Sequence, residues 1–429
     1  MPNAEQRWFH IITITFVMYT IAFIDRTNIS MALPSMSRQL HMDPRQAGAA
    51  VGVFFWGYVV LQIPAAYLAE RWSAKRVVAI LLGLWGACAV ATAFVNTAHQ
   101  FWVMRLVLGL AEGGVWPAAL VLVSHWFPRA ERARANSYWM LCLPLAVVFS
   151  SPLSGWLLTH WNWRVLLIVE GAFPFAWMVI WLLGIDDYPR EAAWISRAEC
   201  EFLESTLARE AKDLKPVKSE GYLAAFLSPQ VLILVAIYFT RNCGSYGSLF
   251  WLPSAVEKAK SLSNFAVGWL VTIPYILTAI MMVLVGRSSD RMHERRMHLS
   301  ATLAWSGLSF IAALWTGSRH PLLSFAFLSI AITGTYASLG PFWSIPTETL
   351  PRKTMAPALG LINAIGNLGG YFGPLVVGYF AKRTGGFAVG FGALAVVMLI
   401  GSGLSFLLRP APMHATPADA AASSIAASD

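Results

Sequence analysis

Two segments of the chain, 66–76 (AYLAERWSAKR) and 286–296 (GRSSDRMHERR), repeat one order of charges. In each, an acidic residue stands directly before an arginine, and a basic pair follows after a short spacer. The charged residues concerned are Glu70, Arg71, Lys75 and Arg76 in the first segment and Asp290, Arg291, Arg295 and Arg296 in the second. Each segment follows the second long apolar run of its half of the chain. The recurrence predicts an internal duplication, with two tandem halves of similar structure.

The composition around these segments is that of a membrane protein. Hydrophobic residues make up 57% of the 429 residues and charged residues only 12%, against about 25% charged in an average soluble domain. A soluble fold could not cover so much apolar surface with so few charges. A backbone in lipid must satisfy its own hydrogen bonds, so helices are expected. The long, uninterrupted apolar runs exclude the short alternating segments of a β-barrel.

Twelve apolar runs are near or above the ~20 residues that a spanning helix needs. They cover residues 10–33, 46–69, 77–96, 100–127, 135–158, 164–184, 229–255, 263–286, 298–316, 321–347, 354–381 and 386–408. We therefore expect an all-α integral membrane protein with two six-helix halves, 1–185 and 229–408, related by pseudo-twofold symmetry. A charged cytoplasmic linker with an amphipathic helix would occupy 186–228, and the Ala/Ser-rich tail, 409–429, is expected to be disordered.

The basic residues predict the orientation. With the N-terminus inside, twenty of the 31 Lys and Arg residues fall on inside segments and eight on outside ones, while Arg26, Arg105 and Arg241 lie within spans. This asymmetry predicts that both termini lie in the cytoplasm. We expect the protein to be in the inner membrane of the cell. The net charge of +9 is thereby accounted for by topology, and no nucleic-acid partner is expected.

A few ionisable residues interrupt the apolar runs, namely Asp25, Arg26, Arg105, Glu112, Glu170 and Arg241. Each costs at least ~2.5–3.5 kcal/mol near the bilayer centre, so each implies a partner or a function. Helical rise puts Arg26 and Arg105 within about 3 Å of one level, with Glu112 roughly 10 Å deeper on the face of Arg105. Asp25 and Arg26 diverge by ~100°, so one faces a central cavity and the other a neighbouring helix.

The chemistry of these groups suggests a division of roles. Arginine stays charged and binds carboxylates through a planar fork, so Arg26, Arg105 and Arg241 predict an anionic substrate. A low-dielectric site favours the protonated form of a carboxyl group, so Asp25 and Glu112 are candidates to carry a coupling proton. A purely structural network of ion pairs is the alternative, although an apolar core would cost less.

The second half offers fewer charged candidates. Asn363 and Asn367 lie one turn apart, able to bind substrate hydroxyls or a carboxylate or simply to join helices. Arg241 could add a second anion contact suited to a dianion, could extend toward the interface, or could pair with Glu170. An aromatic pocket, or only lipid-facing packing, is compatible with Trp56, Trp116, Trp139, Phe342 and Trp343.

The repeated segments resemble the G-x-x-x-(D/E)-R-x-G-x-(K/R)-(K/R) loops of the major facilitator superfamily over essentially the whole chain except the tail. Ala66 and Ser73 replace glycines of that signature in the first copy, and His293 replaces one in the second. The resemblance implies the twelve-helix fold of that superfamily, with these loops acting as charged gating latches on the cytoplasmic face. The alternative is that their basic residues are only positive-inside anchors.

One branch of that superfamily, the anion:cation symporters, is similar in more detail. The matching stretches are Phe23-Ile-Asp25-Arg26-x-Asn28-Ile, Gly57-Tyr58 with Gln62-Ile-Pro64, Arg105-x-x-x-Gly109-x-x-Glu112, Pro117, Trp126-Phe127-Pro128, Trp163-Arg164 through Glu170-Gly171, and Phe250-Trp251-Leu252-Pro253. The resemblance implies proton-driven uptake of an organic anion. It implies that Arg26 and Tyr58 hold the carboxylate, that Asp25 and Glu112 are protonated in turn, and that Arg105 is coupled to Glu112. A charge at Arg241 departs from the branch.

Other classes of protein compete with a symporter. An organic-anion exchanger or effluxer would share the fold, although the stretch 150–155 (SSPLSG) lacks the Gly-Pro run common in antiporters. A membrane sensor is a weaker alternative. No nucleotide-binding loop or metal-spaced histidine pair is present, so no enzyme, cofactor or metal is expected. The expected partners are a small-molecule carboxylate, such as a sugar acid, dicarboxylate or aromatic acid, the coupling proton and membrane lipid, with the protein a monomer.

Overall fold

The computed structural model describes residues 4–128, 131–132, 135, 139–212, 227–260, 262–350 and 352–409, and all regular structure within these ranges is helical. Ten helices of this part of the chain are long and apolar enough to cross a membrane. Two further predicted spans correspond to α15 (Pro229–Lys260) and to α20 (Arg352–Asn367) with α21 (Gly369–Thr384). These helices are more polar, because they carry residues such as Arg241 and Asn367.

The N-terminal half contains six spans in the predicted order. They are α2 (Thr13–Gln39), α3 to α5 (Pro44–Gly52, Phe54–Val60 and Gln62–Arg71), α6 (Ala74–Thr92), α7 with α8 (Ala98–Gly113 and Val115–Trp126), α10 (Cys142–His160), and α11 with α12 (Trp163–Gly171 and Phe173–Gly184). The short helices α1 (Ala4–Arg7) and η1 (Trp8–Ile12) precede α2. The C-terminal half continues after α15 with α16 (Asn264–Met292), α17 (Arg296–Thr316), α18 with α19 (Pro321–Ala337 and Leu339–Thr349), α20 with α21, and α22 (Ala388–Ser405).

Several spans are interrupted once, and proline explains most of the breaks. Pro64, Pro117, Pro174 and Pro341 lie within the first turns of α5, α8, α12 and α19. Proline has no backbone N–H and clashes with the preceding turn, so the hydrogen-bond ladder is broken just before it. Other helices exceed their apolar runs: α2 ends at Gln39 rather than Leu33, because a helix can continue into the polar region beyond the lipid.

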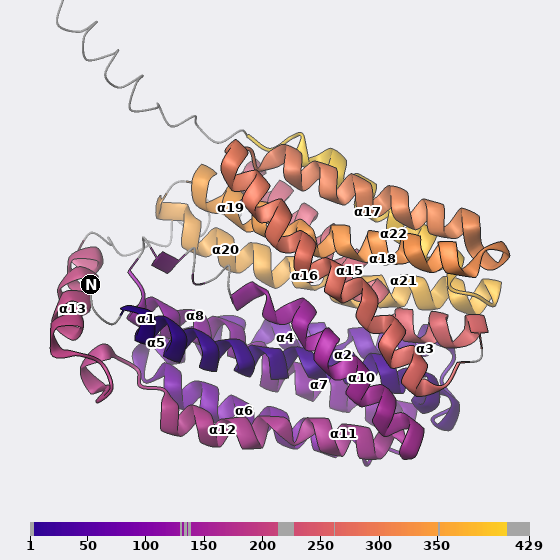
Figure 1. Cartoon of the computed structure of the whole chain (residues 1–429), viewed down its shortest axis with the longest axis horizontal. Helices are drawn as coiled ribbons and strands as arrows, with labels where there is room; N and C mark the ends of the chain where they lie inside the picture. Colours follow the sequence, from indigo (N-terminus) through magenta and orange to yellow (C-terminus); the bar gives the residue numbers. More distant parts are fainter. Residues whose placement is uncertain are drawn as a thin grey trace, which may run out of the picture.

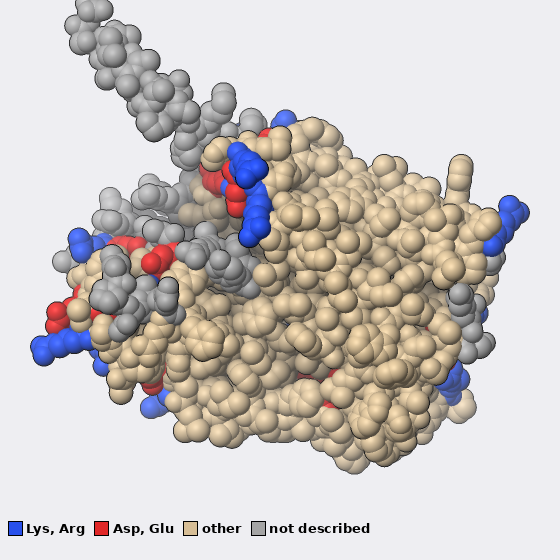
Figure 2. All heavy atoms as spheres, viewed as in Figure 1, with Lys and Arg blue, Asp and Glu red and all other residues tan. Residues whose placement is uncertain are grey.

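The two halves lie side by side, the first in indigo to magenta and the second in orange to yellow (Figure 1). They meet where α2 packs on α15, α10 on α16 and α3 on α21. One end of the molecule carries α13 (Arg197–Lys212) and the opposite end carries α3; we name these the α13 end and the α3 end. Figure 2 shows charged side chains gathered at both ends, with a broad band almost free of charge between them, which fits a multi-pass membrane protein.

The halves are in close contact at the α3 end. A Cβ added to Gly48 would lie 2.4 Å from the carbonyl oxygen of Pro374, and one added to Gly378 would lie 2.2 Å from that of Pro44. Only glycine permits such an approach of two helices. On the other seam, Asn264 donates to the carbonyl oxygen of Leu158 at 3.1 Å.

Two ion pairs join the halves at the same end. Lys382 contacts Asp43 at 2.8 Å, and Arg38 contacts Glu257 at 3.1 Å. Asp43 also caps α3 by accepting from the backbone N–H of Gln46. Partial burial opposes the charged carboxylate, but Lys382 and this backbone N–H more than compensate and hold the pKa of Asp43 below its ordinary value. The α3 end is therefore closed.

The segment after α12 is attached to the N-terminal half. Arg7 pairs with Glu131 at 2.9 Å and with Glu199 of α13 at 3.2 Å. The helix α13 lies within the linker, 186–228, in which an amphipathic helix is predicted. The rest of the predicted linker from 213 to 226, and the predicted disordered tail from 410, lie outside the described residues.

Candidate substrate site

The site begins with an unusually close crossing of α4 and α7. A Cβ on Gly109 would lie 2.0 Å from the carbonyl oxygen of Phe54, and one on Gly57 would lie 2.2 Å from that of Leu106. These glycines bring the two backbones together. The crossing places Arg105 of α7 against the ring of Phe54 in α4.

Arg26 of α2 lies at the centre of this arrangement. Its Nη2 donates to Oε1 of Glu112, forming an ion pair between two side chains that are almost completely buried. The guanidinium carbon lies 5.2 Å from the ring centres of both Phe54 and Tyr58. Arg26 also lines the central cavity, so one guanidinium group borders both the carboxylate of Glu112 and the space for a ligand.

Arg105 lies behind Phe54, 4.7 Å from the centre of the ring that Arg26 also contacts. The two arginines thus share the level that helical rise predicts. Arg105 is fully buried, and its three guanidinium nitrogens have no hydrogen-bond partner among the described residues. It is absent from the residues that line the cavity. Arg105 is therefore a positive charge close to Glu112, behind the residues that line the cavity.

Asp25 points away from the cavity, which settles the alternative left open by the sequence. Trp85 of α6 donates its indole N–H to Oδ2, and Asn28 donates to Oδ1 at 3.1 Å. Asp25 therefore faces α6, while its neighbour Arg26 faces the cavity.

Arg241 of α15 lines the cavity from the C-terminal half. Its Nε donates to the carbonyl oxygen of Thr335 at 2.9 Å, and Nη1 donates to Asn242 at 2.7 Å. Nη2 is buried without a partner in the described part of the chain. The alternative pairing with Glu170 is not found, because Glu170 instead accepts from Ser154.

Asn363 and Asn367 of α20 complete the cavity wall. Asn367 donates to the side-chain oxygen of Asn363 at 3.0 Å. Asn363 in turn donates to Gln62 of α5 at 2.7 Å, across the two halves. Gln62 lies nearer the α13 end of its span than Tyr58 does, so this hydrogen bond joins the halves on that side of the cavity.

Aromatic residues supply most of the remaining wall. Tyr58 lines the cavity, and its hydroxyl lies 3.3 Å from that of Tyr19. Trp116 also lines the cavity and stacks on Trp139, with the two ring centres 4.2 Å apart. Among the other predicted aromatics, Trp343 lies outside the lining set and packs on Tyr238, as does Phe342, while Trp56 is 46% exposed.

Sequence reasoning gave no role in the site to four tyrosines that line the cavity. They are Tyr19, Tyr238, Tyr246 and Tyr336. A signal was present for the first, because Tyr19 precedes Arg26 by seven residues and so shares its helical face. No comparable spacing identifies Tyr336. This residue of α18 contacts Arg241 only through tertiary packing, with its ring centre 4.9 Å from the guanidinium carbon.

The first repeated loop is held to the end of the N-terminal half. Ser73 stands where the superfamily signature has a glycine. It adopts an extended conformation and caps α6. Its hydroxyl and the backbone N–H of Lys75 both donate to Asp187, and Lys75 Nζ lies 3.4 Å from Asp186. The side chains of Glu70, Arg71 and Arg76 are exposed.

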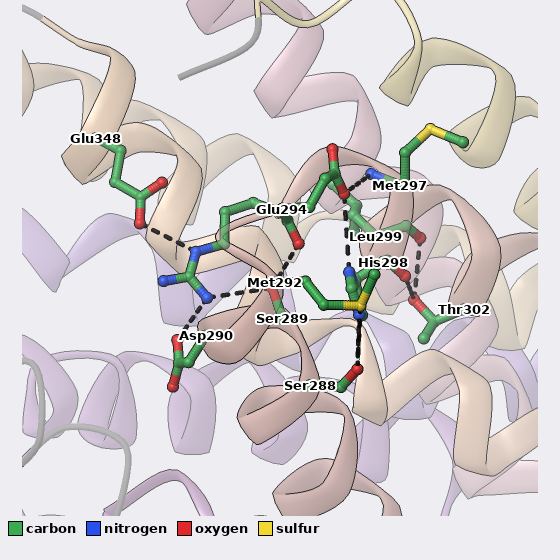
Figure 3. A network of polar contacts seen from close by, with 11 residues as sticks. Ser288, Ser289, Asp290, Met292, Glu294, Met297, His298, Leu299, Thr302 and Glu348 are labelled. Atoms are coloured by element: carbon green, nitrogen blue, oxygen red, sulfur yellow. Dashed lines mark hydrogen bonds and ion pairs between the residues drawn. The ribbon is translucent and has the colours of Figure 1, made fainter. Parts of the chain in front are cut away.

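The second loop forms a denser network (Figure 3). Arg295 pairs with Asp290 and, at 3.0 Å, with Glu348 of α19. Partial burial opposes the charged guanidinium, but these carboxylates more than compensate and raise the pKa of Arg295 above its ordinary value. Arg296 donates to the carbonyl oxygen of Leu408, whereas Arg291 is exposed. In both copies these contacts of the loop join segments of a single half.

Comparison with known proteins agrees with this architecture. A family model described as the Major Facilitator Superfamily matches residues 15–265 and 255–428. A protein of Agrobacterium vitis named as a tartrate transporter is 32% identical over 93% of this chain and 90% of its own length. A galactarate/D-glucarate transporter named from Bacillus subtilis is 27% identical over 95% and 92%. A quinolone resistance transporter of Acinetobacter baumannii is 28% identical over 93% of each chain.

The fold likeness extends to solved structures. A bacterial homologue of the human lysosomal transporter Spinster, in an inward-facing conformation, superposes with a TM-score of 0.75 at 17% identity, covering 94% of this chain and 97% of that one. The chain therefore belongs to the Major Facilitator Superfamily. Within that superfamily it is a transporter of the anion:cation symporter type, as its repeated loops and buried charges predict.

Proposed function

We propose that the protein imports a small organic acid together with protons, by alternating access across the inner membrane. The observation that carries this proposal is the position of Arg26, which pairs with Glu112 and also borders the cavity. A substrate carboxylate that binds Arg26 competes with Glu112 for the same guanidinium group. Protonation of Glu112 removes that competitor, so proton binding and substrate binding favour one another.

The wall opposite Arg26 bears on the substrate class. Arg241 lines the cavity and its Nη2 has no hydrogen-bond partner, and no acidic side chain of the described residues forms an ion pair with it. Two arginines with one carboxylate partner between them suit a substrate with two negative groups. Asn363, Asn367 and the tyrosines supply hydrogen bonds for hydroxyl groups. A hydroxylated dicarboxylate fits this set, in keeping with the tartrate and glucarate named for two relatives.

The orientation follows from the same account. We place the α13 end and both termini in the cytoplasm, with the loops 66–76 and 286–296 as cytoplasmic gating segments. The closed α3 end then faces the periplasm, and the hydrogen bond between Gln62 and Asn363 separates the cavity from the cytoplasm. We expect the protein to act as a monomer, with the boundaries of its two halves at 185 and 229.

The test is uptake of labelled tartrate and galactarate into proteoliposomes with an inward proton gradient. The proposal predicts accumulation that collapses when the gradient is dissipated. Glu112→Gln should weaken the dependence of uptake on pH, whereas Glu204→Gln, on the exposed face of α13, should leave it unchanged.

A second candidate is export or exchange on the same fold, favoured by the similarity to a quinolone resistance transporter. Counterflow distinguishes it. Vesicles preloaded with unlabelled substrate and lacking a proton gradient would take up label through an exchanger at the full rate seen with the gradient.

A further inference from the structure

Glu170 of α11 is a buried acid that this account has not used. It is fully buried, and its Oε1 accepts a hydrogen bond from the Ser154 hydroxyl of α10 at 2.7 Å. Its Oε2 has no hydrogen-bond partner in the described ranges. The resemblance to anion:cation symporters includes this glutamate but gives it no task.

Within the part of the chain that the structure describes, Glu170 has no positively charged partner. None of the ion pairs between described residues involves it. The helices α2, α6, α10 and α12 pack against α11. From α2 the charged group that acts on Glu170 is Asp25, another acid. The neighbouring stretch of α6 offers Cys88, α12 carries no titratable residue, and α10 has only Cys142 and His160 near its ends.

A carboxylate in such a place is unstable. Burying an ionised group without a partner costs far more than burying a neutral one, so a lone acid inside a membrane protein is held in its protonated form. Replacing the glutamate by an apolar residue would remove that cost altogether. Its presence therefore points to a function in which the carboxyl group gains and loses a proton.

Two further hydroxyl groups of α10 lie beyond Ser154 on the side of the central cavity. Ser150 lies one turn from Ser154 on the same face, and Ser151 lies beside it. Both are buried, and neither hydroxyl has a partner among the described residues. Leu143, about two turns further along α10, lines the central cavity. Two unsatisfied hydroxyl groups thus lie on the side of Ser154 that faces the substrate site, about 10 Å short of Leu143.

The same helix forms a seam between the halves at the α3 end. A Cβ on Gly155, the residue after Ser154, would lie 2.6 Å from the carbonyl oxygen of Asn264 in α16. The Thr159 hydroxyl accepts from the backbone N–H of Phe265 at 3.0 Å. Separation of the halves at this end breaks these contacts next to the partner of Glu170, and so exposes the pair to water.

We propose that Glu170 is a further proton-binding site of the transport cycle, with two buried serine hydroxyl groups of α10 between it and the level of the substrate cavity. With the α3 end open, a proton from outside water forms the O–H bond of the Glu170 carboxyl group. The closed state described here carries that proton in neutral form. After the α13 end opens, the O–H bond breaks and the proton passes to water on the cytoplasmic side, so each cycle moves one more proton than Asp25 and Glu112 account for.

This inference rests on the proposed proton coupling, and the experiment separates the two. The ratio of protons to substrate is measured from reversal potentials in proteoliposomes with labelled tartrate, for the wild type, Glu170→Gln, Glu170→Asp and the exposed control Glu204→Gln. We expect the ratio to fall by one proton per substrate in Glu170→Gln and to be retained in Glu170→Asp and in the control.

The outcomes are distinguishable. If the wild type moves no protons with substrate, the proposed function fails. If the wild type does so and Glu170→Gln keeps the full ratio, only the role of Glu170 is overturned. Should Glu170→Gln not fold, infrared difference spectra of the wild type replace it. A protonated-carboxyl C=O band that changes on substrate addition and shifts in Glu170→Asp supports the proposal, and spectra identical for the wild type and Glu170→Asp overturn it.

Discussion

Arg26 on α2 forms an ion pair with Glu112 on α7, and the same guanidinium group borders the central cavity. Both side chains are almost completely buried, so the pair holds its geometry without water. Breaking a buried pair by removing one partner costs about 3–5 kcal/mol, because the other charge is left uncompensated. Two events together can break this pair without leaving a charge unpaired. A substrate carboxylate can take the place of Glu112 at Arg26, and Glu112 can be neutralised by a proton.

Arg26→Gln is predicted to abolish substrate binding and also to lower the melting temperature, since Glu112 would lose its counter-ion. The double variant Arg26→Gln/Glu112→Gln should recover most of the lost stability, because neither charge remains buried alone. It should still fail to bind tartrate. Thermal unfolding and binding calorimetry on the purified variants measure both quantities. Equal melting temperatures for the single and double variants would contradict the pairing.

Glu112→Gln alone is predicted to free Arg26 at every pH. In the wild type, tartrate should bind more weakly as the pH rises, since the ionised Glu112 carboxylate then competes for Arg26. In the variant this loss should disappear, so that affinity at alkaline pH exceeds that of the wild type. Affinity measured by calorimetry across a pH series decides the matter. A pH dependence that is unchanged by the substitution would count against Glu112 as a proton-binding group.

Arg241→Gln should weaken the binding of one of the two negative groups of a dianionic substrate. Loss of a charge-assisted hydrogen bond is worth about 1.5–3 kcal/mol, so the affinity for tartrate should fall by roughly 10- to 100-fold. A monocarboxylate of similar size should bind with little change, because Arg26 still holds its single charge. The exposed Arg319→Gln is the matched control. An equal loss for both ligands would indicate that Arg241 only supports the helices around it.

Asp43→Asn should loosen the α3 end while keeping the cap of α3, since asparagine is also a good N-cap. An exposed ion pair contributes about 0.2–1 kcal/mol, so the population open at this end should rise by up to about fivefold. Distances between spin labels at His99, in the first turn of α7, and His320, directly before α18, report that population, because both residues are exposed and belong to different halves.

The same pair predicts a pH effect. Because the pKa of Asp43 is lowered by Lys382, the ion pair is intact above the ordinary aspartate value and is lost as the pH falls through the lowered one. Acidification should therefore open the α3 end in the wild type and have less effect in Asp43→Asn. Identical label distances in both proteins across the acid range would show that the pair does not hold this end closed.

Much of the fold and the charged core follows from the sequence. Apolar length gives the spans, and helical rise places Arg26 and Arg105 at one level, where the structure brings both against Phe54. The direction in which Asp25 points does not follow from the sequence, because it depends on a hydrogen bond from Trp85 of α6. Likewise the partners of Arg241 come from Thr335 on another helix and from its neighbour Asn242. Helical periodicity predicts faces and depths, whereas contacts between helices depend on tertiary packing.

The central claim is that organic-acid uptake is driven by protons through Glu112 and Arg26. The most direct measurement is tartrate accumulation in proteoliposomes under an imposed proton gradient, compared with the same vesicles after the gradient is dissipated. Our account predicts concentrative uptake with the gradient, mere equilibration without it, and a lower accumulation ratio for Glu112→Gln under the same gradient, because one coupled proton is lost. An accumulation ratio unchanged by Glu112→Gln, or wild-type uptake that ignores the gradient, would contradict it.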